Sequence, residues 1–135
     1  MGRLLGIDYG SKRVGIAVTD ELRIVATPLD IWQNDQSFWK KLADLVVKYG
    51  IEAFVLGFPA SDKYREASDA VEGFRGALAR RFPGMEIFLQ NERFSSVIAE
   101  GHLRASGLTQ KEIRGKLDKY AAQKILEDYL REPGK

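Results

Sequence analysis

The sequence predicts an α/β domain built on one mixed sheet, and two features of its pattern support this fold class. Residues 4–26 contain three short apolar runs joined by tight turns. Further along, runs with helical spacing alternate with short runs of bulky apolar residues. Tightly joined strands must be antiparallel, because a parallel return needs a crossover of about a dozen residues, whereas strands separated by helices pair in parallel. We therefore expect the order βββαβαβαα, with helices covering the faces of the sheet.

The first three strands are expected where apolar runs meet polar turns. Residues 4–8 form one expected strand and residues 14–19 the next, with turn residues at 9–12 between them. A third strand is expected over residues 22–26. Pro28 should end it, because proline has no N–H to donate to a neighbouring strand.

Helical spacing begins after these strands. Apolar residues from Phe38 to Tyr49 recur with the period of a helix. Ser37 is the expected N-cap, and Gly50 is placed to end the helix. Residues 51–57, rich in bulky apolar side chains, form the fourth expected strand.

A second helix, a fifth strand and two further helices complete the expected order. The second helix is marked by apolar residues with helical spacing: Ala67, Ala70, Val71, Phe74 and Leu78. Pro83 and the glycine after it should end that helix, and the strand of residues 85–89 follows. The last two helices are expected over residues 95–105 and 116–130, with a polar, basic connection at 106–115 between them.

Composition limits the class of protein and its compartment. Hydrophobic residues make up 44% and charged residues 30% of the chain, the balance of a single globular domain over residues 1–135. No apolar run approaches the roughly 20 residues of a membrane-spanning helix, and Asp8 interrupts the first apolar stretch too early for a secretory signal. Without cysteine there is no disulfide and no zinc–thiolate site, so we expect a cytoplasmic protein without membrane contact. The net charge of +2 is only a mild hint of an anionic partner.

Three acidic residues stand where packing alone would not place them. Asp8 ends an apolar strand expected at the centre of the sheet, and Glu92 directly follows another strand of buried type. Asp118 opens the last expected helix, on the face that should pack on the sheet. Ala121 and Ala122 keep that helix slim, which would let its backbone approach the strands closely.

Acids that converge in a partly buried site repel one another unless a cation joins them. Hard divalent ions prefer carboxylate and water oxygens, and Mg²⁺ commonly binds protein carboxylates together with substrate phosphate. In a two-metal phosphodiesterase, one ion generates the attacking hydroxide and the other stabilises the leaving oxygen. The set Asp8, Glu92 and Asp118 therefore indicates such an enzyme, with these acids as metal ligands and catalytic residues.

Each acid also has a simpler interpretation. Asp8 would serve as a turn-capping acid before the next glycine. Glu92 would join Arg93 or Arg13 in a surface ion pair. Asp118 would be a first-turn acid favoured by the helix dipole. The joint placement of the three, rather than any one of them, favours a site.

Four blocks of sequence, in order along the chain, carry a family resemblance. The first is long and specific, and it runs from Leu5 to Asp20 as LGIDYGSKRVGIAVTD. The other three are Leu56–Pro59 (LGFP), Asn91–Ser96 (NERFSS) and Leu117–Leu126 (LDKYAAQKIL). Together they cover almost the whole chain and resemble the YqgF family.

This resemblance implies a ribonuclease H-like fold, with three antiparallel strands followed by two parallel ones in the sheet order 3-2-1-4-5. Family members are described as Holliday-junction-resolvase-like proteins and as nucleases that mature the small-subunit ribosomal RNA precursor. The family's acidic positions fall on Asp8, Glu92 and Asp118, in agreement with the placement argument. The resemblance also implies dependence on Mg²⁺ or Mn²⁺ and a role at the 5′ end of precursor 16S ribosomal RNA in ribosome biogenesis.

Two segments depart from the family pattern. Asn91 stands where the family usually has an acid, which removes an auxiliary acid and leaves Glu92 intact. The stretch Ala60–Tyr64 lacks an expected Asp-Gly pair and would alter a loop beside the site.

Basic residues near these acids are the expected nucleic-acid contacts. Lys12 and Arg13 lie in the turn after Asp8, and Arg93 follows the second acid. The remaining expected contacts are Arg114, Lys116 and Lys119. Such residues bind phosphates without reading sequence, and their contribution weakens with salt. For Arg114 and the nearby Lys111, an ordinary solvated loop is the alternative.

Three functions fit these observations. The first is a metal-dependent endonuclease that acts on structured RNA, with precursor ribosomal RNA favoured and the ribosomal precursor particle as a partner. The second keeps this chemistry on branched DNA, as a Holliday-junction resolvase, and both a monomer and a homodimer stay open. The third is a non-catalytic nucleic-acid-binding module. An actin-like ATPase also begins with Gly-Ile-Asp, but it needs two such domains and this chain has room for one.

Overall fold

The computed structural model describes residues 2–59, 65–92, 105, 107 and 109–131. For residues 59, 65–68, 92 and 110–119 it describes the backbone alone.

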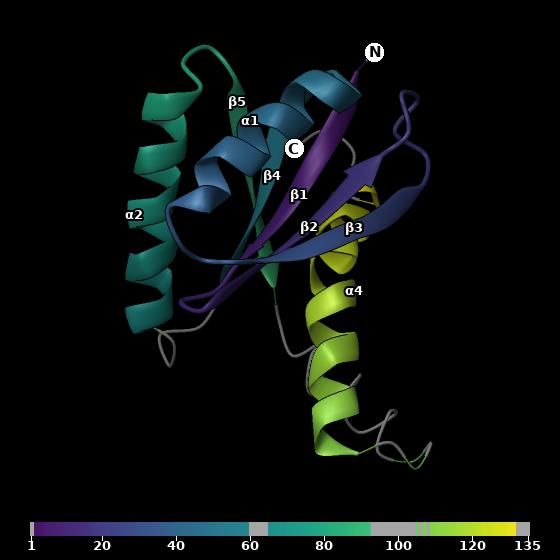
Figure 1. The fold of residues 1–135 in the computed structure, drawn as a ribbon. Coiled ribbons are helices and arrows are strands. Elements are labelled where there is room, and N and C mark those ends of the chain that lie inside the picture. The colour runs from purple at the N-terminus through teal and green to yellow at the C-terminus, as the bar shows by residue number, and fades with distance from the viewer. Residues whose placement is uncertain (1, 60–64, 93–104, 106, 108, 132–135) are drawn as a thin grey trace.

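Five strands form one sheet in the order β3-β2-β1-β4-β5 (Figure 1). The strands are β1 (Arg3–Tyr9), β2 (Arg13–Thr19), β3 (Ala26–Gln33), β4 (Ile51–Pro59) and β5 (Glu86–Glu92). β2 pairs antiparallel with both β1 and β3, whereas β4 pairs parallel with both β1 and β5. The expected mixed sheet and its order 3-2-1-4-5 are confirmed, and β1 is its central strand.

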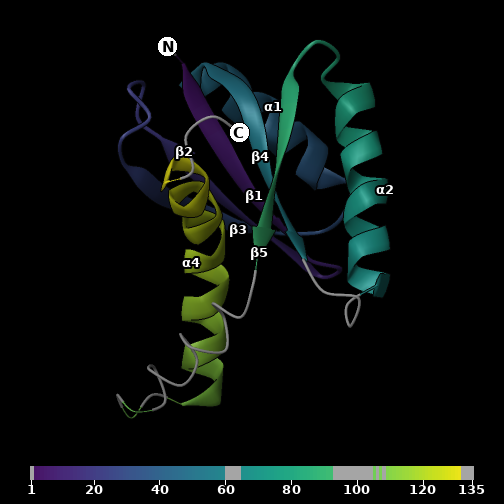
Figure 2. The same ribbon diagram turned by 180° about the vertical axis from the view of Figure 1, so that it is seen from behind.

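Helices cover both faces of the sheet. α1 (Ser37–Tyr49) and α2 (Arg65–Arg81) lie on one face, and α4 (Gln110–Arg131) lies on the other (Figures 1 and 2). In the part of the chain that the structure describes, no helix is both long and apolar enough to cross a membrane.

Strand residues alternate between two core clusters, one on each face. Leu5 and Ile7 of β1 belong to the cluster under α1 and α2, where the rings of Phe38 and Phe74 stack with centroids 5.7 Å apart. Leu4 belongs to the cluster under α4, together with three buried residues of that helix. This alternation determines which strand positions face α4.

The prediction that the third strand spans residues 22–26 is wrong. β3 begins at Ala26 and continues through Pro28, which pairs with Ala17 directly after a shift in register. β3 is an edge strand, and proline is tolerated at sheet edges and beside irregularities in register. Residues 22–25 instead belong to the turn between β2 and β3.

The expected N-cap at Ser37 is wrong, because Gln36 is the N-cap of α1 and the side chain of Asp35 accepts the hydrogen bonds at this helix start. Ser37 is already helical, and both its N–H (2.9 Å) and its hydroxyl donate to Asp35 Oδ1. These bonds, the hydroxyl bond foremost, lower the pKa of Asp35. The expected C-cap is confirmed, because Gly50 ends α1 in the left-handed conformation with φ of +63°.

α2 buries most of the apolar face that the sequence predicted. Val71, Phe74 and Leu78 pack in the cluster shared with α1. Ala70 is exposed, contrary to the expectation, because it lies at the edge of the buried stripe, about 100° around the helix from Val71.

The later elements are longer than expected. β5 continues to Glu92 instead of ending at residue 89, and it is an edge strand with exposed positions rather than a fully buried one. α4 begins at Gln110 instead of residue 116, so most of the expected polar connection is helical and Asp118 is the ninth residue of α4. The expected helix over residues 95–105 lies almost entirely outside the described residues.

Candidate active site at the carboxyl end of the central strand

Asp8 lies one residue before the end of β1, on the face that α4 covers. Ile7 belongs to the cluster under α1 and α2, whereas Leu4 belongs to the cluster under α4. Because successive strand residues point to opposite faces, Asp8 faces α4, as Leu4 does. Its side chain is partly buried.

Glycines flank Asp8 on both neighbouring strands. Gly15 of β2 is paired directly opposite it. On β4, Gly57 follows Leu56, the partner of Ile7, so Gly57 stands beside Asp8. Both glycines are buried, and neither adds a side chain next to the Asp8 carboxylate.

The same row of the sheet ends on Gln90 of β5. Gln90 is paired with Gly57 and lies on the face of Phe88, which packs in the cluster under α4. Its side chain is only 2% exposed, and its Oε1 is buried without a hydrogen-bond donor among the described residues. A buried carboxamide therefore shares the face of Asp8, with one glycine between them.

The turn after β1 is tight and is held by Asn34. A Cβ on Gly10 would lie 2.5 Å from the carbonyl oxygen of Arg13, so only glycine fits there. Asn34 donates from Nδ2 to the Gly10 carbonyl (2.8 Å) and from its backbone N–H to the Lys12 carbonyl (2.9 Å). Lys12 lies in this turn and Arg13 begins β2 directly after it, so both exposed residues are at the same end of the sheet as Asp8.

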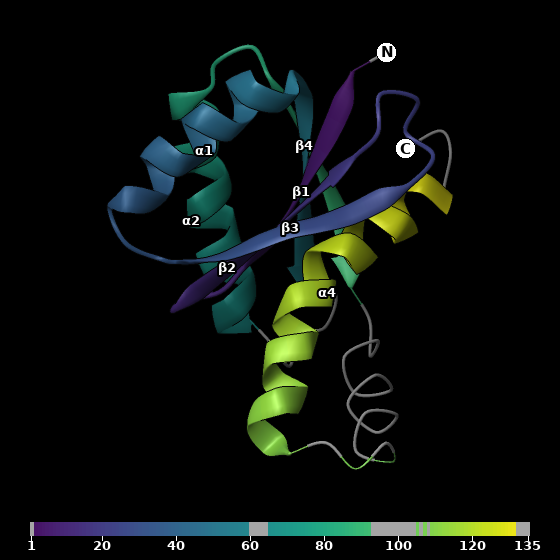
Figure 3. The ribbon, with the colours of Figure 1, turned by 45° about the vertical axis from the view of Figure 1, so that its right-hand side comes forward.

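α4 crosses the sheet so closely that only glycine fits beneath it. A Cβ on Gly6 would lie 2.9 Å from the carbonyl oxygen of Ala122 and 2.5 Å from Leu126 Cγ, which confirms the expected close approach. The N-terminal half of α4 extends past the carboxyl ends of β4 and β5 (Figure 3). Asp118 stands in that half, one turn before Ala122, and its depth within α4 rules out the simpler interpretation as a first-turn acid.

The backbone brings the elements that carry the three expected acids to one end of the sheet. Glu92 is the last residue of β5 and is paired with Pro59 of β4. Among the side chains that the structure describes, no three acidic or histidine residues gather into a group. The side chains of the following expected site residues lie outside the described part of the chain: Glu92, Arg93, Arg114, Lys116, Asp118 and Lys119.

Gln90, Asn34 and the flanking glycines were not expected as site residues. A signal for the glycines was present, because a glycine inside a strand weakens it unless close approach or a ligand requires it. Gln90 follows an apolar run directly. Its position beside Gly57, however, depends on the pairing of β4 with β5, which the sequence does not state.

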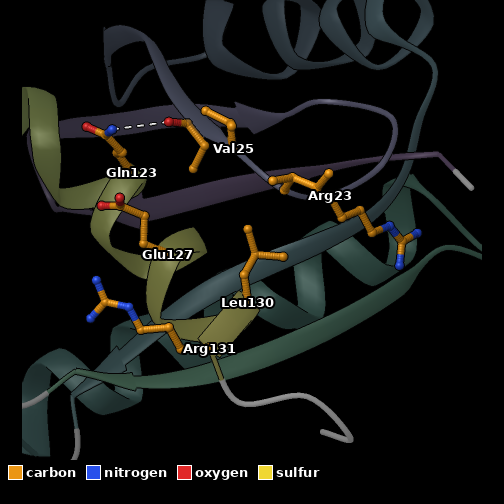
Figure 4. A pocket seen from close by; sticks show the side chains of 8 residues that line it. Arg23, Val25, Gln123, Glu127, Leu130 and Arg131 are labelled. Atoms are coloured by element: carbon orange, nitrogen blue, oxygen red, sulfur yellow. Dashed lines mark hydrogen bonds between the residues drawn. The ribbon is translucent and has the colours of Figure 1, made fainter.

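A surface pocket of about 430 Å³ lies at the opposite end of the sheet, between the β2–β3 turn and the C-terminal half of α4 (Figure 4). Its lining residues are Arg23, Ile24, Val25, Ala26, Gln123, Glu127, Leu130 and Arg131. Gln123 donates to the carbonyl of Ala26 at 3.1 Å, the bond drawn in Figure 4. Neither Asp8 nor Lys12 lines this pocket, so we call this part of the molecule the Arg23 end and the candidate site the Asp8 end.

Polar side chains at the Arg23 end hold the turn in place. Asp20 Oδ1 accepts hydrogen bonds from the N–H groups of Val25 (2.9 Å) and Ile24 (2.7 Å). These bonds, that of Val25 foremost, lower the pKa of the Asp20 carboxyl. Arg23 Nε donates to the carbonyl of Gly2 at 2.8 Å and so ties the turn to the start of the chain.

Comparison with known sequences gives matches over nearly the whole chain. The family model described as "RuvX: Holliday junction resolvase" matches residues 2–132. A protein of Amoebophilus asiaticus is 42% identical, with 96% of this chain and 94% of that protein covered. A protein of Sulfurihydrogenibium sp. is 37% identical, with 96% and 90% covered. Both are named "Putative pre-16S rRNA nuclease", and these matches confirm the family resemblance drawn from the four sequence blocks.

Two solved structures share the fold. RuvC of T. thermophilus, solved in complex with Holliday junction substrate, has a TM-score of 0.56 and 16% identity, with 97% of this chain and 96% of that chain covered. The fowlpox virus Holliday junction resolvase has a TM-score of 0.53 and 13% identity, with 96% and 98% covered. At these identities the likeness shows the fold alone, and the expected ribonuclease H-like fold is confirmed.

Proposed function

Because the chain belongs to the RuvX family of Holliday junction resolvases, we propose that it is a metal-dependent endonuclease that acts on structured nucleic acid. The favoured substrate is precursor 16S ribosomal RNA, cut during maturation of its 5′ end on a ribosomal precursor particle in the cytoplasm. One observation carries the proposal: an acid, Asp8, faces α4 at the carboxyl end of the central strand, between two glycines.

The surroundings of Asp8 support a ligand-binding role for it. A partly buried carboxylate on a packed face needs a cation or hydrogen-bond donors to offset its lost hydration. Gly15 and Gly57 leave the sheet without side chains on either side of the carboxylate. The parallel strands β1, β4 and β5 also end at this edge, where ligands of α/β sheets commonly bind.

Glu92 and Asp118 are the other two acids of the proposed site. Glu92 is four residues after Phe88 on β5, a spacing that keeps the register of the α4 face. Asp118 is one helical turn before Ala122, the residue whose carbonyl closely approaches Gly6.

The donor set fits a hard divalent ion. Carboxylate oxygens are the protein ligands that Mg²⁺ and Mn²⁺ prefer, so Asp8, Glu92 and Asp118 would hold one ion or a pair. When bound, a pair of such ions supplies Lewis-acid catalysis on both sides of the scissile phosphodiester.

Basic residues position the substrate by its phosphates. Lys12 and Arg13 are exposed in and directly after a turn that Asn34 ties by hydrogen bonds, at the end of the sheet that carries Asp8. A cation on a fixed turn binds phosphate with less loss of conformational freedom than one on a loose loop. We assign the same role to Arg93, Arg114, Lys116 and Lys119.

Branched DNA is the second candidate substrate. It is favoured by the description of the matching family model as a Holliday junction resolvase, whereas the names of the relatives favour precursor RNA. Both substrates present phosphates in a folded nucleic acid, and the same residues would serve either.

The test is cleavage of two end-labelled substrates by the wild type and Asp8→Asn. One substrate is structured RNA spanning the 5′ end of 16S ribosomal RNA in its precursor, and the other is a four-way DNA junction. Each is incubated with Mg²⁺, Mn²⁺ or EDTA. We expect metal-dependent cutting of the RNA that Asp8→Asn abolishes, because the substitution keeps the volume of the side chain and removes its charge.

The other outcomes separate the alternatives. Cutting of the junction instead of the RNA would show that branched DNA is the substrate. Salt-sensitive binding of both substrates without cutting, unchanged by Asp8→Asn, would contradict a nuclease and favour a non-catalytic binding module.

A further inference from the structure

We propose that Gln90 is a positioning residue of the Asp8 site, whose carboxamide oxygen accepts a hydrogen bond from water of the hydrated divalent ion. The inference rests on the proposed function, because it requires that ion at Asp8. It concerns a side chain with no carboxylate charge, on the strand that ends with Glu92.

The first observation is an unsatisfied buried acceptor. Gln90 is 2% exposed, and no described residue donates to its Oε1. Buried polar atoms are nearly always hydrogen-bonded, and one that lacks a partner lowers the stability of the folded state. A water or an ion that interacts with such an atom would account for it.

The second observation is the row of the sheet that Gln90 shares with Asp8. Gln90 is paired with Gly57, and Gly57 stands beside Asp8. Neighbouring strands are about 4.8 Å apart, so the two Cα atoms lie roughly 10 Å apart. Both side chains are on the α4 face and flank a position that no side chain of β4 occupies.

The chemistry of a carboxamide suits this position. Mg²⁺ gives up its water reluctantly and usually keeps several water ligands. The protons of such waters are strong donors, and a neutral oxygen accepts them without adding a fourth negative charge beside the three acids. Asn91 does not offer the same group, since it is exposed and strand alternation turns it to the other face.

The experiment measures Mn²⁺ affinity by calorimetry and the melting temperature in EDTA for the wild type and Gln90→Met. Methionine keeps the unbranched shape and removes the acceptor. We expect the melting temperature in EDTA to rise by a few degrees, because an unsatisfied buried group is gone. We expect Mn²⁺ affinity to fall by about 10-fold or more, as for other groups that support metal ligands.

A matched control and a second variant separate this role from a purely structural one. Gln123→Met removes a carboxamide that donates to Ala26 at the Arg23 end, so it should lower the melting temperature and leave Mn²⁺ affinity unchanged. Gln90→Glu keeps the oxygen and adds charge, so it should bind Mn²⁺ more tightly and melt at a lower temperature in EDTA.

Asp8→Asn in the same titration separates failure of the proposed function from failure of the role proposed for Gln90. A wild type that binds no Mn²⁺, or an Asp8→Asn that binds it equally well, would overturn the proposed function. Loss of Mn²⁺ binding in Asp8→Asn with wild-type affinity in Gln90→Met would overturn the role of Gln90 alone. A Gln90→Met that is less stable in EDTA would also overturn it, since the carboxamide would then serve the fold.

Discussion

The two ends of the sheet use polar residues in opposite ways. At the Arg23 end, Thr19 Oγ1 accepts the N–H of Leu4 (2.9 Å), and the Arg23 guanidinium pairs with Glu52 (3.3 Å) as well as with the chain start. At the Asp8 end, glycines take the places beside the acid, and a buried carboxamide oxygen has no donor among the described residues. The hydrogen bonds at the first end hold the fold together, whereas the second end combines an acid between glycines with one buried acceptor, the features on which we base the proposed site.

This contrast teaches where to look for function in a small α/β domain. A sheet end whose residues break the usual rules for strands, with interior glycines and an unsatisfied acceptor, is where a binding site is to be sought, because such departures concentrate at functional sites. The pocket at the Arg23 end is lined by Gln123 and Arg23, whose side chains have partners within the protein.

The largest stability effect is expected where α4 meets the sheet. In Gly6→Ala the new Cβ would lie too close to the Ala122 carbonyl and to Leu126, so α4 must shift outward. Overpacking of this kind costs about 1–3 kcal/mol, and the shift would also carry Asp118 away from the Asp8 end. The urea concentration at the midpoint of unfolding and the cleavage rate should both fall below the wild-type values.

A matched control for Gly6→Ala is Gly73→Ala on α2. A Cβ there meets nothing within 4 Å, so the helix should gain about 0.5–1 kcal/mol of stability from alanine. If Gly6→Ala proved as harmless as Gly73→Ala, the close approach of α4 would not be needed.

A smaller effect is expected from the basic turn at the Asp8 end. Lys12→Ala, made in an Asp8→Asn background to prevent cutting, should weaken RNA binding and lower the slope of log affinity against log salt by roughly 1. Lys40→Ala on the exposed side of α1 should change neither quantity. Equal slopes for both variants would show that Lys12 does not contact the phosphates of the RNA.

The smallest effect is a pH dependence at the Arg23 end. The bonds from Val25 and Ile24 lower the pKa of Asp20 in the folded state below its ordinary value of 3.8. The stability this provides is therefore present above pH 3.8 and is lost as the pH falls through the lowered pKa. Urea midpoints measured from pH 7 down to below pH 3.8 should show this loss of stability in the wild type. In Asp20→Asn the part of the pH dependence that comes from Asp20 should be absent.

Much of the fold could be predicted because it follows from local rules. Turn lengths separated antiparallel from parallel strands, and the family blocks gave the strand order. The third strand was wrong because proline is tolerated at a sheet edge, and which strand is an edge depends on the pairing of β2 with β3. The start of α4 was wrong because the polar segment before Lys116 is also rich in good helix formers.

The sequence could predict the acids of the candidate site and the basic residues beside Asp8, but not its uncharged residues. Asp8 was expected because an acid at the end of an apolar strand is unusual along the chain itself. Gln90 could not be identified in that way, because its burial and its place beside Gly57 arise from the register between β4 and β5. Asn34 is remote in sequence from the turn that it holds, and a single hydrogen bond of this kind leaves no sequence pattern.

The most direct test of the contrast between the two ends compares Asp8→Asn with Asp20→Asn, each measured for Mn²⁺-dependent cleavage and for melting temperature in EDTA. Asp8→Asn should lower cleavage by more than about 100-fold, beyond the loss caused by groups that only support a metal ligand, with the melting temperature kept. Asp20→Asn should lower the melting temperature, because a turn-capping carboxylate is lost, and should keep the cleavage rate. Wild-type cleavage by Asp8→Asn would contradict the assignment of chemistry to the Asp8 end.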